Sequence, residues 1–175
     1  ARKQRVLLVD DEPEVLVALE DLLGDDFEVS KATSPDGALE LLEHEPEIAV
    51  VVTDQQMPKM TGEEFLATFP DQCAAQRIIL TGYADIQAVI RAVNSGRLFA
   101  YLTKPWNPHD LHEKVVRAAR QFRLSRRLRN ERELMHRLLD QDPDCLYFKD
   151  RELHFDEANR AFVHMVGAYD RSHRH

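Results

Sequence analysis

The chain has few cysteines, no long apolar run and no surplus of positive charge. Its only cysteines, Cys73 and Cys145, lack the spacing of a metal or redox pair, so we expect reduced thiols in a cytoplasmic protein rather than a disulfide framework. No apolar stretch reaches the roughly 18 residues of a membrane span, and the run at 6–9 is shorter than the about 7–15 residues of a secretory leader. The net charge of −8 argues against nucleic acid as the main partner.

Short apolar runs alternate with segments of helical periodicity as far as residue 122. We expect five strands at these runs: 6–9, 27–30, 48–53, 77–80 and 98–102. The third run is almost wholly apolar, which is typical of a strand buried on both faces. Side chains that can cap a helix precede three of the helical segments: Ser34, Thr61 and Asn107. Five strands alternating with five helices predict an α/β fold with a doubly wound, five-stranded parallel sheet.

Acidic side chains and one lysine follow three of these runs. Asp10 and Asp11 come after the first run, Asp54 after the third and Lys104 after the fifth. Because the carboxyl ends of parallel strands meet at one edge of an open sheet, we expect these residues to share a pocket. Carboxylates held together repel one another unless a cation neutralises them, and Mg²⁺ prefers such hard oxygen ligands. The alternative is that both N-terminal aspartates only cap a helix and that the lysine is a solvated loop cation.

These landmarks, taken in order, resemble the receiver domain of two-component response regulators over residues 4–122. The matching positions are Asp10, Asp11, Asp54, Thr81, Lys104 and Pro105. The stretches 57–62 and 81–85 add to the resemblance. It implies a flavodoxin-like receiver fold and a phospho-accepting signalling module.

The resemblance also implies a metal site and a nucleophile. Asp11 and Asp54 bind Mg²⁺ directly in this family pattern, Asp10 binds it through water, and the backbone carbonyl of Gln56 supplies a further ligand. Asp54 is then the phosphoacceptor, which takes the phosphoryl group from a sensor histidine kinase or a phosphotransfer protein and forms an acyl phosphate.

Further matching residues concern the phosphorylated state. The resemblance implies that Lys104 pairs with the phosphoryl oxygens, across a Lys104–Pro105 peptide bond expected to be cis, and that the Thr81 hydroxyl donates to the phosphate. Tyr101 stands where receivers place a ring that moves inward with Thr81; the alternative is an ordinary half-buried strand aromatic. Tyr83 flanks the site, where a bulky ring is expected to slow attack by water.

Beyond residue 122 the chain remains helical without resembling a receiver. No proline or glycine follows Pro108 as far as Asp140, so we expect one continuous helix of about 50 Å. Apolar residues at 3,4 spacing within 123–141 predict a short coiled-coil seam for a parallel homodimer: Leu124, Leu128, Met135 and Leu138, interrupted by Glu131. The alternative is a lone amphipathic helix. The interleaved arginines and glutamates indicate a solvated face rather than a DNA-binding one.

The remaining segment, 142–175, resembles the opening of a PAS domain. Stretches at 145–150 and 153–155 predict two strands, and 159–163 predicts the start of a short helix. The segment is too short for a complete domain of this kind, so it is either part of a longer protein or vestigial. We therefore predict three parts: a receiver at 1–122, a helical linker at 123–141 and a partial PAS-like α+β segment at 142–175.

Three functions are compatible with these patterns. The favoured one is a response regulator, in which phosphorylation of Asp54 switches the C-terminal helix and a downstream output. A phosphorylation-independent dimer scaffold is the second. The third is an Asp-nucleophile phosphatase of the haloacid dehalogenase type, but that family places another Asp where this chain has Gln56. We therefore expect no enzymatic activity in these residues themselves.

Overall fold

The computed structural model describes residues 3–45, 47–69, 73–82, 86–94, 98–152 and 154–172. The chain divides into two compact units, Ala1–Ser125 and Arg126–His175, and the boundary between them falls within one helix. None of the described helices is both long and apolar enough to cross a membrane.

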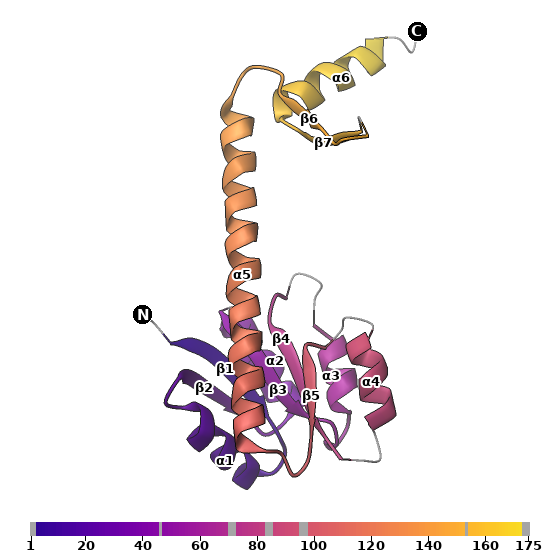
Figure 1. Cartoon of the computed structure of the whole chain (residues 1–175). Helices are drawn as coiled ribbons and strands as arrows, with labels where there is room; N and C mark the ends of the chain where they lie inside the picture. Colours follow the sequence, from indigo (N-terminus) through magenta and orange to yellow (C-terminus); the bar gives the residue numbers. More distant parts are fainter. Residues whose placement is uncertain are drawn as a thin grey trace. The chain divides into compact units, whose positions relative to one another are not determined.

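The first unit is a parallel sheet with helices on both faces (Figure 1). Its strands are β1 (Gln4–Val9), β2 (Phe27–Ala32), β3 (Ile48–Asp54), β4 (Gln76–Thr81) and β5 (Ala100–Thr103). The helices are α1 (Pro13–Leu23), α2 (Pro35–His44), α3 (Gly62–Ala67), α4 (Ile86–Asn94) and α5 (Pro108–Gln141). All neighbouring strands pair in parallel, in the order β2-β1-β3-β4-β5. The predicted doubly wound fold is confirmed, although the fifth strand begins at Ala100 rather than at residue 98.

The three predicted helix caps are present. Ser34 Oγ accepts a hydrogen bond from the backbone N–H of Gly37 at 3.2 Å, at the start of α2. Thr61 begins α3 with a reciprocal capping box. Asn107 Oδ1 accepts from two backbone N–H groups in the first turn of α5, at 2.9 and 3.1 Å. Each cap satisfies backbone donors that have no partner inside the helix, so the sequence fixes where these helices start.

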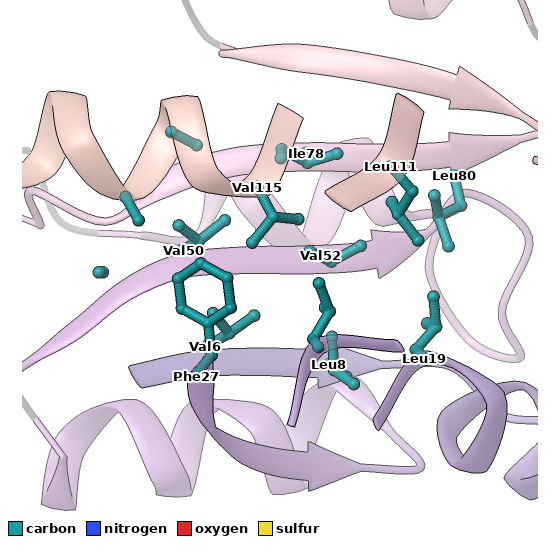
Figure 2. Close-up of a cluster of buried hydrophobic side chains, with 14 of the residues drawn as sticks. Val6, Leu8, Leu19, Phe27, Val50, Val52, Ile78, Leu80, Leu111 and Val115 are labelled. Carbon is teal, nitrogen blue, oxygen red and sulfur yellow. The ribbon is translucent and has the colours of Figure 1, made fainter. Parts of the chain in front are cut away.

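The core of the first unit consists of two apolar layers, one on each face of the sheet. Every residue of β3 is buried, as predicted for a strand covered on both sides. One layer, shown in Figure 2, joins the sheet to α1 and α5 and includes Leu8, Leu19, Val52, Leu111 and Val115. The other joins it to α2, α3 and α4 and includes Leu7, Ala38, Val51, Phe65 and Val89. These layers hold the strand ends, and hence the polar residues that follow them, in fixed positions.

The second unit contains the end of α5 followed by β6 (Tyr147–Lys149), β7 (Phe155–Ala158) and α6 (Arg160–Ser172). The two strands pair antiparallel, so the predicted order of two strands and a helix is correct. The helix α5 runs without interruption to Gln141, as the lack of proline and glycine predicts. Three aromatic rings gather here, Tyr147, Phe155 and Phe162, with centroids 4.9 to 5.5 Å apart.

One buried amide, Asn159, connects the elements of the second unit. Its side-chain nitrogen donates to the backbone carbonyls of Leu139 at 3.0 Å and Asp144 at 2.7 Å. Its side-chain oxygen accepts from the backbone N–H groups of Leu146 at 3.0 Å and Phe162 at 3.1 Å. This single side chain therefore ties the end of α5 to the start of β6 and to the first turn of α6.

Candidate functional site

Three aspartates meet at the carboxyl edge of the sheet. Asp10 follows β1, Asp54 is the last residue of β3, and Asp11 lies in the turn before α1. One carboxylate oxygen from each lies within 4.8 Å of the others. Asp10 and Asp54 are buried, whereas Asp11 is exposed, so the group opens to solvent on one side. Strand ends that are distant in sequence thus present three hard oxygen ligands to one point, which suits a small divalent cation.

Lys104 supplies the positive charge of this group. Its Nζ lies 3.1 Å from Asp10 Oδ2 and 3.1 Å from Asp54 Oδ1, so one ammonium bridges two buried carboxylates. The Lys104 backbone N–H donates to the carbonyl of Thr81 at 2.8 Å, which joins the loop after β5 to the end of β4. The Lys104–Pro105 peptide bond is cis, as expected.

The helix-capping and solvated-cation alternatives do not describe these residues. Residue Glu12 is the N-cap of α1, and α1 receives no side-chain cap. Asp10 Oδ1 instead accepts from the Glu12 backbone N–H at 2.9 Å, which shapes the turn while its other oxygen contacts Lys104. Lys104 itself is paired on two sides. The fold therefore brings these carboxylates and the lysine into contact with one another.

Burial and charge act in opposite directions on the titration of this group. Burial raises the pKa of Asp54 above its usual range, and the negative charge of Asp10 adds to this, although Lys104 and the Gln56 backbone N–H counteract it. Burial alone would lower the pKa of Lys104, but hydrogen bonds and attraction from Asp54 and Asp10 together raise it. The lysine therefore stays charged, while Asp54 carries a carboxylate whose desolvation is only partly compensated.

Thr81 and Gln56 lie beside the acidic group. Thr81 is fully buried at the end of β4, and its hydroxyl donates to the carbonyl of Gly82 at 3.0 Å. Gln56 follows Asp54 by two residues and is exposed, with its backbone N–H directed at the Asp54 carboxylate.

The two tyrosines singled out from the sequence differ in what the structure describes. Tyr101 is half-buried on β5, where it pairs in register with Ile79 and packs against the core layer of α2, α3 and α4. This placement is compatible with both sequence interpretations of the ring. Tyr83, and with it the prediction about access of water, lies outside the described residues.

The sequence patterns assigned no physical role to two residues next to Asp54, namely Gly62 and Gln55. A Cβ atom on Gly62 would lie 2.3 Å from the backbone oxygen of Asp54, so only glycine allows α3 to start this close to β3. The Gly62 N–H donates to the carbonyl of Gln55 at 2.9 Å. The glycine was visible in the stretch 57–62 only as part of a resemblance. For Gln55 no periodicity or motif gave a signal.

A doubly wound α/β domain with three aspartates and a lysine at its carboxyl edge is the arrangement expected of a receiver, and comparison with known proteins agrees. The sequence model described as "Response regulator receiver domain" matches residues 6–116. The chain belongs to this family. Membership separates it from the Asp-nucleophile phosphatases considered as an alternative.

Several characterised relatives are transcriptional regulators. The chain is 36% identical over 118 residues to the hydrogenase transcriptional regulatory protein HoxA of Cupriavidus necator, which covers 67% of this chain and 24% of that protein. It is 30% identical over 143 residues to the response regulator protein PilR of Pseudomonas aeruginosa, covering 81% of this chain and 31% of that protein. The chain thus spans only about a quarter to a third of these relatives.

Solved structures show the same fold. A response regulator receiver domain from Clostridium thermocellum aligns with a TM-score of 0.65 and 33% identity, covering 69% of this chain and 98% of that one. A chain described as adenylate cyclase from Rhodopirellula baltica aligns with a TM-score of 0.68 and 30% identity, covering 76% of this chain and 97% of that one.

Proposed function

We propose that this chain accepts a phosphoryl group on Asp54 from a sensor histidine kinase or a phosphotransfer protein, and so acts as the receiver of a response regulator. The observation that carries the proposal is the bridge from Lys104 to both Asp10 and Asp54, at 3.1 Å each, beside an exposed Asp11. This arrangement gives a nucleophile, a cation for phosphoryl oxygens and an opening to solvent in one place.

The transfer requires few groups. A carboxylate oxygen of Asp54 attacks phosphorus in line as the P–N bond to the donor histidine breaks, which leaves an acyl phosphate on Asp54 and a free imidazole on the donor. Lys104 offers its point charge to the phosphoryl oxygens. Burial of the Asp54 carboxylate leaves it poorly solvated, so little water must be removed before attack.

The donor set fits Mg²⁺. Asp11 and Asp54 are the candidate direct ligands, Asp10 a ligand through water, and the Gln56 carbonyl a further one. When bound, Mg²⁺ supplies charge neutralisation between the carboxylates and the incoming phosphoryl oxygens. Within this arrangement the ion pairs with Lys104 restrict rotation of the Asp10 and Asp54 side chains, and the exposed Asp11 leaves the pocket open to solvent.

Output is proposed to follow from Thr81 and Tyr101. The Thr81 hydroxyl, which donates to the Gly82 carbonyl in this structure, turns to the phosphoryl group. Tyr101 then moves inward into the space that Thr81 leaves. The exposed apolar residues of α5 support a parallel homodimer as the carrier of the signal: Leu124, Leu128, Met135 and Leu138 are between 48% and 67% exposed in the single chain. Residues 142–175 are proposed to be a partial PAS-like segment.

Intact mass spectrometry with Mg²⁺ and a small phosphodonor tests the nucleophile. We expect the wild-type chain to gain the mass of one phosphoryl group and Asp54→Asn to gain none. Asp36→Asn, which removes an exposed aspartate outside the group, is the matched control and should be phosphorylated normally. An adduct on Asp54→Asn would sink the proposal.

Light scattering tests the dimer separately. Leu128→Glu places a charge in the middle of the α5 seam and should give monomers, whereas Asn130→Glu, which adds the same charge on the opposite face of the helix, should not. A wild-type chain that is monomeric with and without phosphodonor would remove the dimer from the proposal and leave the phosphoacceptor in place.

A further inference from the structure

Gln55, immediately after the acceptor, is a buried polar residue held by three hydrogen bonds. It is only 5% exposed. Its backbone N–H donates to the carbonyl of Leu80 on β4 at 2.8 Å, and its carbonyl accepts from Gly62 at 2.9 Å. Its side-chain Oε1 accepts from the backbone N–H of Glu63 at 3.1 Å. Gln55 is thus attached to a neighbouring strand and, twice, to the start of α3.

A buried amide at this position needs an explanation. Burying a polar side chain costs free energy unless it is hydrogen-bonded, and an apolar residue would suit a position that leads out of the core. The bond that Gln55 makes goes to one of the first N–H groups of α3, which have no partner inside the helix. Thr61 already caps α3 through the N–H of Glu64, so the helix has a cap of its own without Gln55.

The two caps differ in what they connect. Thr61 lies next to α3 in the chain and joins the helix only to itself. Gln55 lies between Asp54 and Gln56, so its side-chain bond connects α3 to the two residues that are proposed to supply a carboxylate and a carbonyl to one cation. With both backbone groups and the side chain engaged, the peptide units on either side of Gln55 have little freedom to turn.

We infer that Gln55 is a positioning residue: its side-chain bond to Glu63 fixes the turn after β3 so that the Asp54 carboxylate and the Gln56 carbonyl face the same cation. This inference rests on the proposed function, since it concerns the same site. Groups that orient metal ligands from behind typically change metal affinity by about 10- to 100-fold when they are replaced. Gln55 does so through backbone geometry rather than through a contact with a ligand atom.

The test compares Gln55→Met with Thr61→Ala in the full chain. Methionine keeps the volume of the buried side chain but cannot accept the Glu63 hydrogen bond, while Thr61→Ala removes the other side-chain cap of α3. For each variant, Mg²⁺ affinity is measured by fluorescence of Trp106, the only tryptophan, and by the Mg²⁺-dependent rise in melting temperature. The rate of Asp54 phosphorylation is measured beside them.

We expect Gln55→Met to weaken Mg²⁺ binding by about tenfold and to slow phosphorylation, with Thr61→Ala close to wild type in both. Gln55→Asn, whose amide is one carbon too short to reach Glu63, should behave like Gln55→Met and serves if the methionine variant does not fold. Wild-type Mg²⁺ affinity in both Gln55 variants, or an equal loss in Thr61→Ala, would overturn the inference alone. A wild-type chain that neither binds Mg²⁺ nor accepts a phosphoryl group would overturn the proposed function with it.

Discussion

Different interactions stabilise the two units of this chain. The first buries apolar side chains in two layers, and its buried polar residues lie around the carboxyl edge of the sheet. In the second unit, among the residues whose burial the structure describes, Asn159 alone is buried. Its large apolar side chains remain about half exposed, including Tyr147, Phe148 and Phe155. One unit therefore depends on many apolar contacts and the other on a few directed hydrogen bonds.

This difference sets how each unit tolerates change. A fully buried apolar side chain contributes roughly 1.5–3 kcal/mol, and the first unit has many of them, so it can carry an unfavourable cluster of carboxylates at its edge. A single hydrogen bond contributes about 1 kcal/mol net, but leaving its partners unsatisfied costs more. The second unit therefore has a single position on which several backbone groups depend.

Replacing a core aromatic ring should have the largest effect. Phe65 in α3 is fully buried and contacts Phe69 edge to face, so Phe65→Ala should lower the free energy of unfolding by about 3–5 kcal/mol. Phe155→Ala, at a ring 60% exposed in the second unit, should cost only about 1 kcal/mol. Urea titration followed by circular dichroism measures both. Equal losses would contradict the contrast between the units.

Removing the buried amide should unfold the second unit selectively. Asn159→Leu leaves the N–H groups of Leu146 and Phe162 without their acceptor and should cost about 1–3 kcal/mol. Hydrogen exchange should show these amides unprotected while those of β3 stay protected. Asn159→Asp keeps the acceptor but places a carboxylate oxygen against the carbonyls of Leu139 and Asp144, so it should not restore protection. Asn130→Leu, at an exposed asparagine of α5, is the control and should leave both amides protected. Loss of protection in β3 would mean that the units do not unfold independently.

An asparagine in the first unit sharpens the comparison. Asn107 is exposed and caps α5 through two backbone N–H groups, so Asn107→Ala should cost about 1 kcal/mol because water replaces the lost bonds. Thermal unfolding followed by Trp106 fluorescence reports on the first unit, which holds the only tryptophan. A loss of unfolding free energy as large as that of Phe65→Ala would show that Asn107 stabilises more of the unit than the first turn of α5.

The smallest expected effect is a pH dependence at Asp54. Because its pKa is raised in the folded chain, the folded state holds this proton at pH values where the unfolded state, with a pKa of about 3.9, has lost it. Wild-type stability should therefore fall, relative to Asp54→Asn, as pH rises through that window, and level off above it. Urea titrations of both chains without Mg²⁺ across this pH range measure the difference in their free energies of unfolding. A difference that does not change with pH would refute the prediction.

Sequence patterns predicted the first unit well because its stabilising groups are periodic. Apolar runs and capping residues located the strands and helices, and the rule that parallel strand ends converge brought Asp10, Asp54 and Lys104 together. Gly62 and Gln55 escaped this reasoning, since their roles depend on the close approach of α3 to β3, a distance that no local pattern encodes. Asn159 escaped it for the same reason, because its partners lie as far back as Leu139.

The bridging position of Lys104 has a consequence for how the site responds to its ionic surroundings. Ion pairs at the surface, such as Lys59 with Asp36, weaken as monovalent salt is added, whereas buried pairs are screened far less. The ammonium of Lys104, which is only partly exposed, thus acts as an internal counter-ion that bulk salt screens less than it does a surface pair. A divalent cation entering the pocket meets carboxylates that are already partly neutralised, and fewer uncompensated charges make a weaker, more readily reversible site. Mg²⁺ binding at this pocket, as proposed above, should then follow free Mg²⁺ and depend less on sodium or potassium than binding at a surface site.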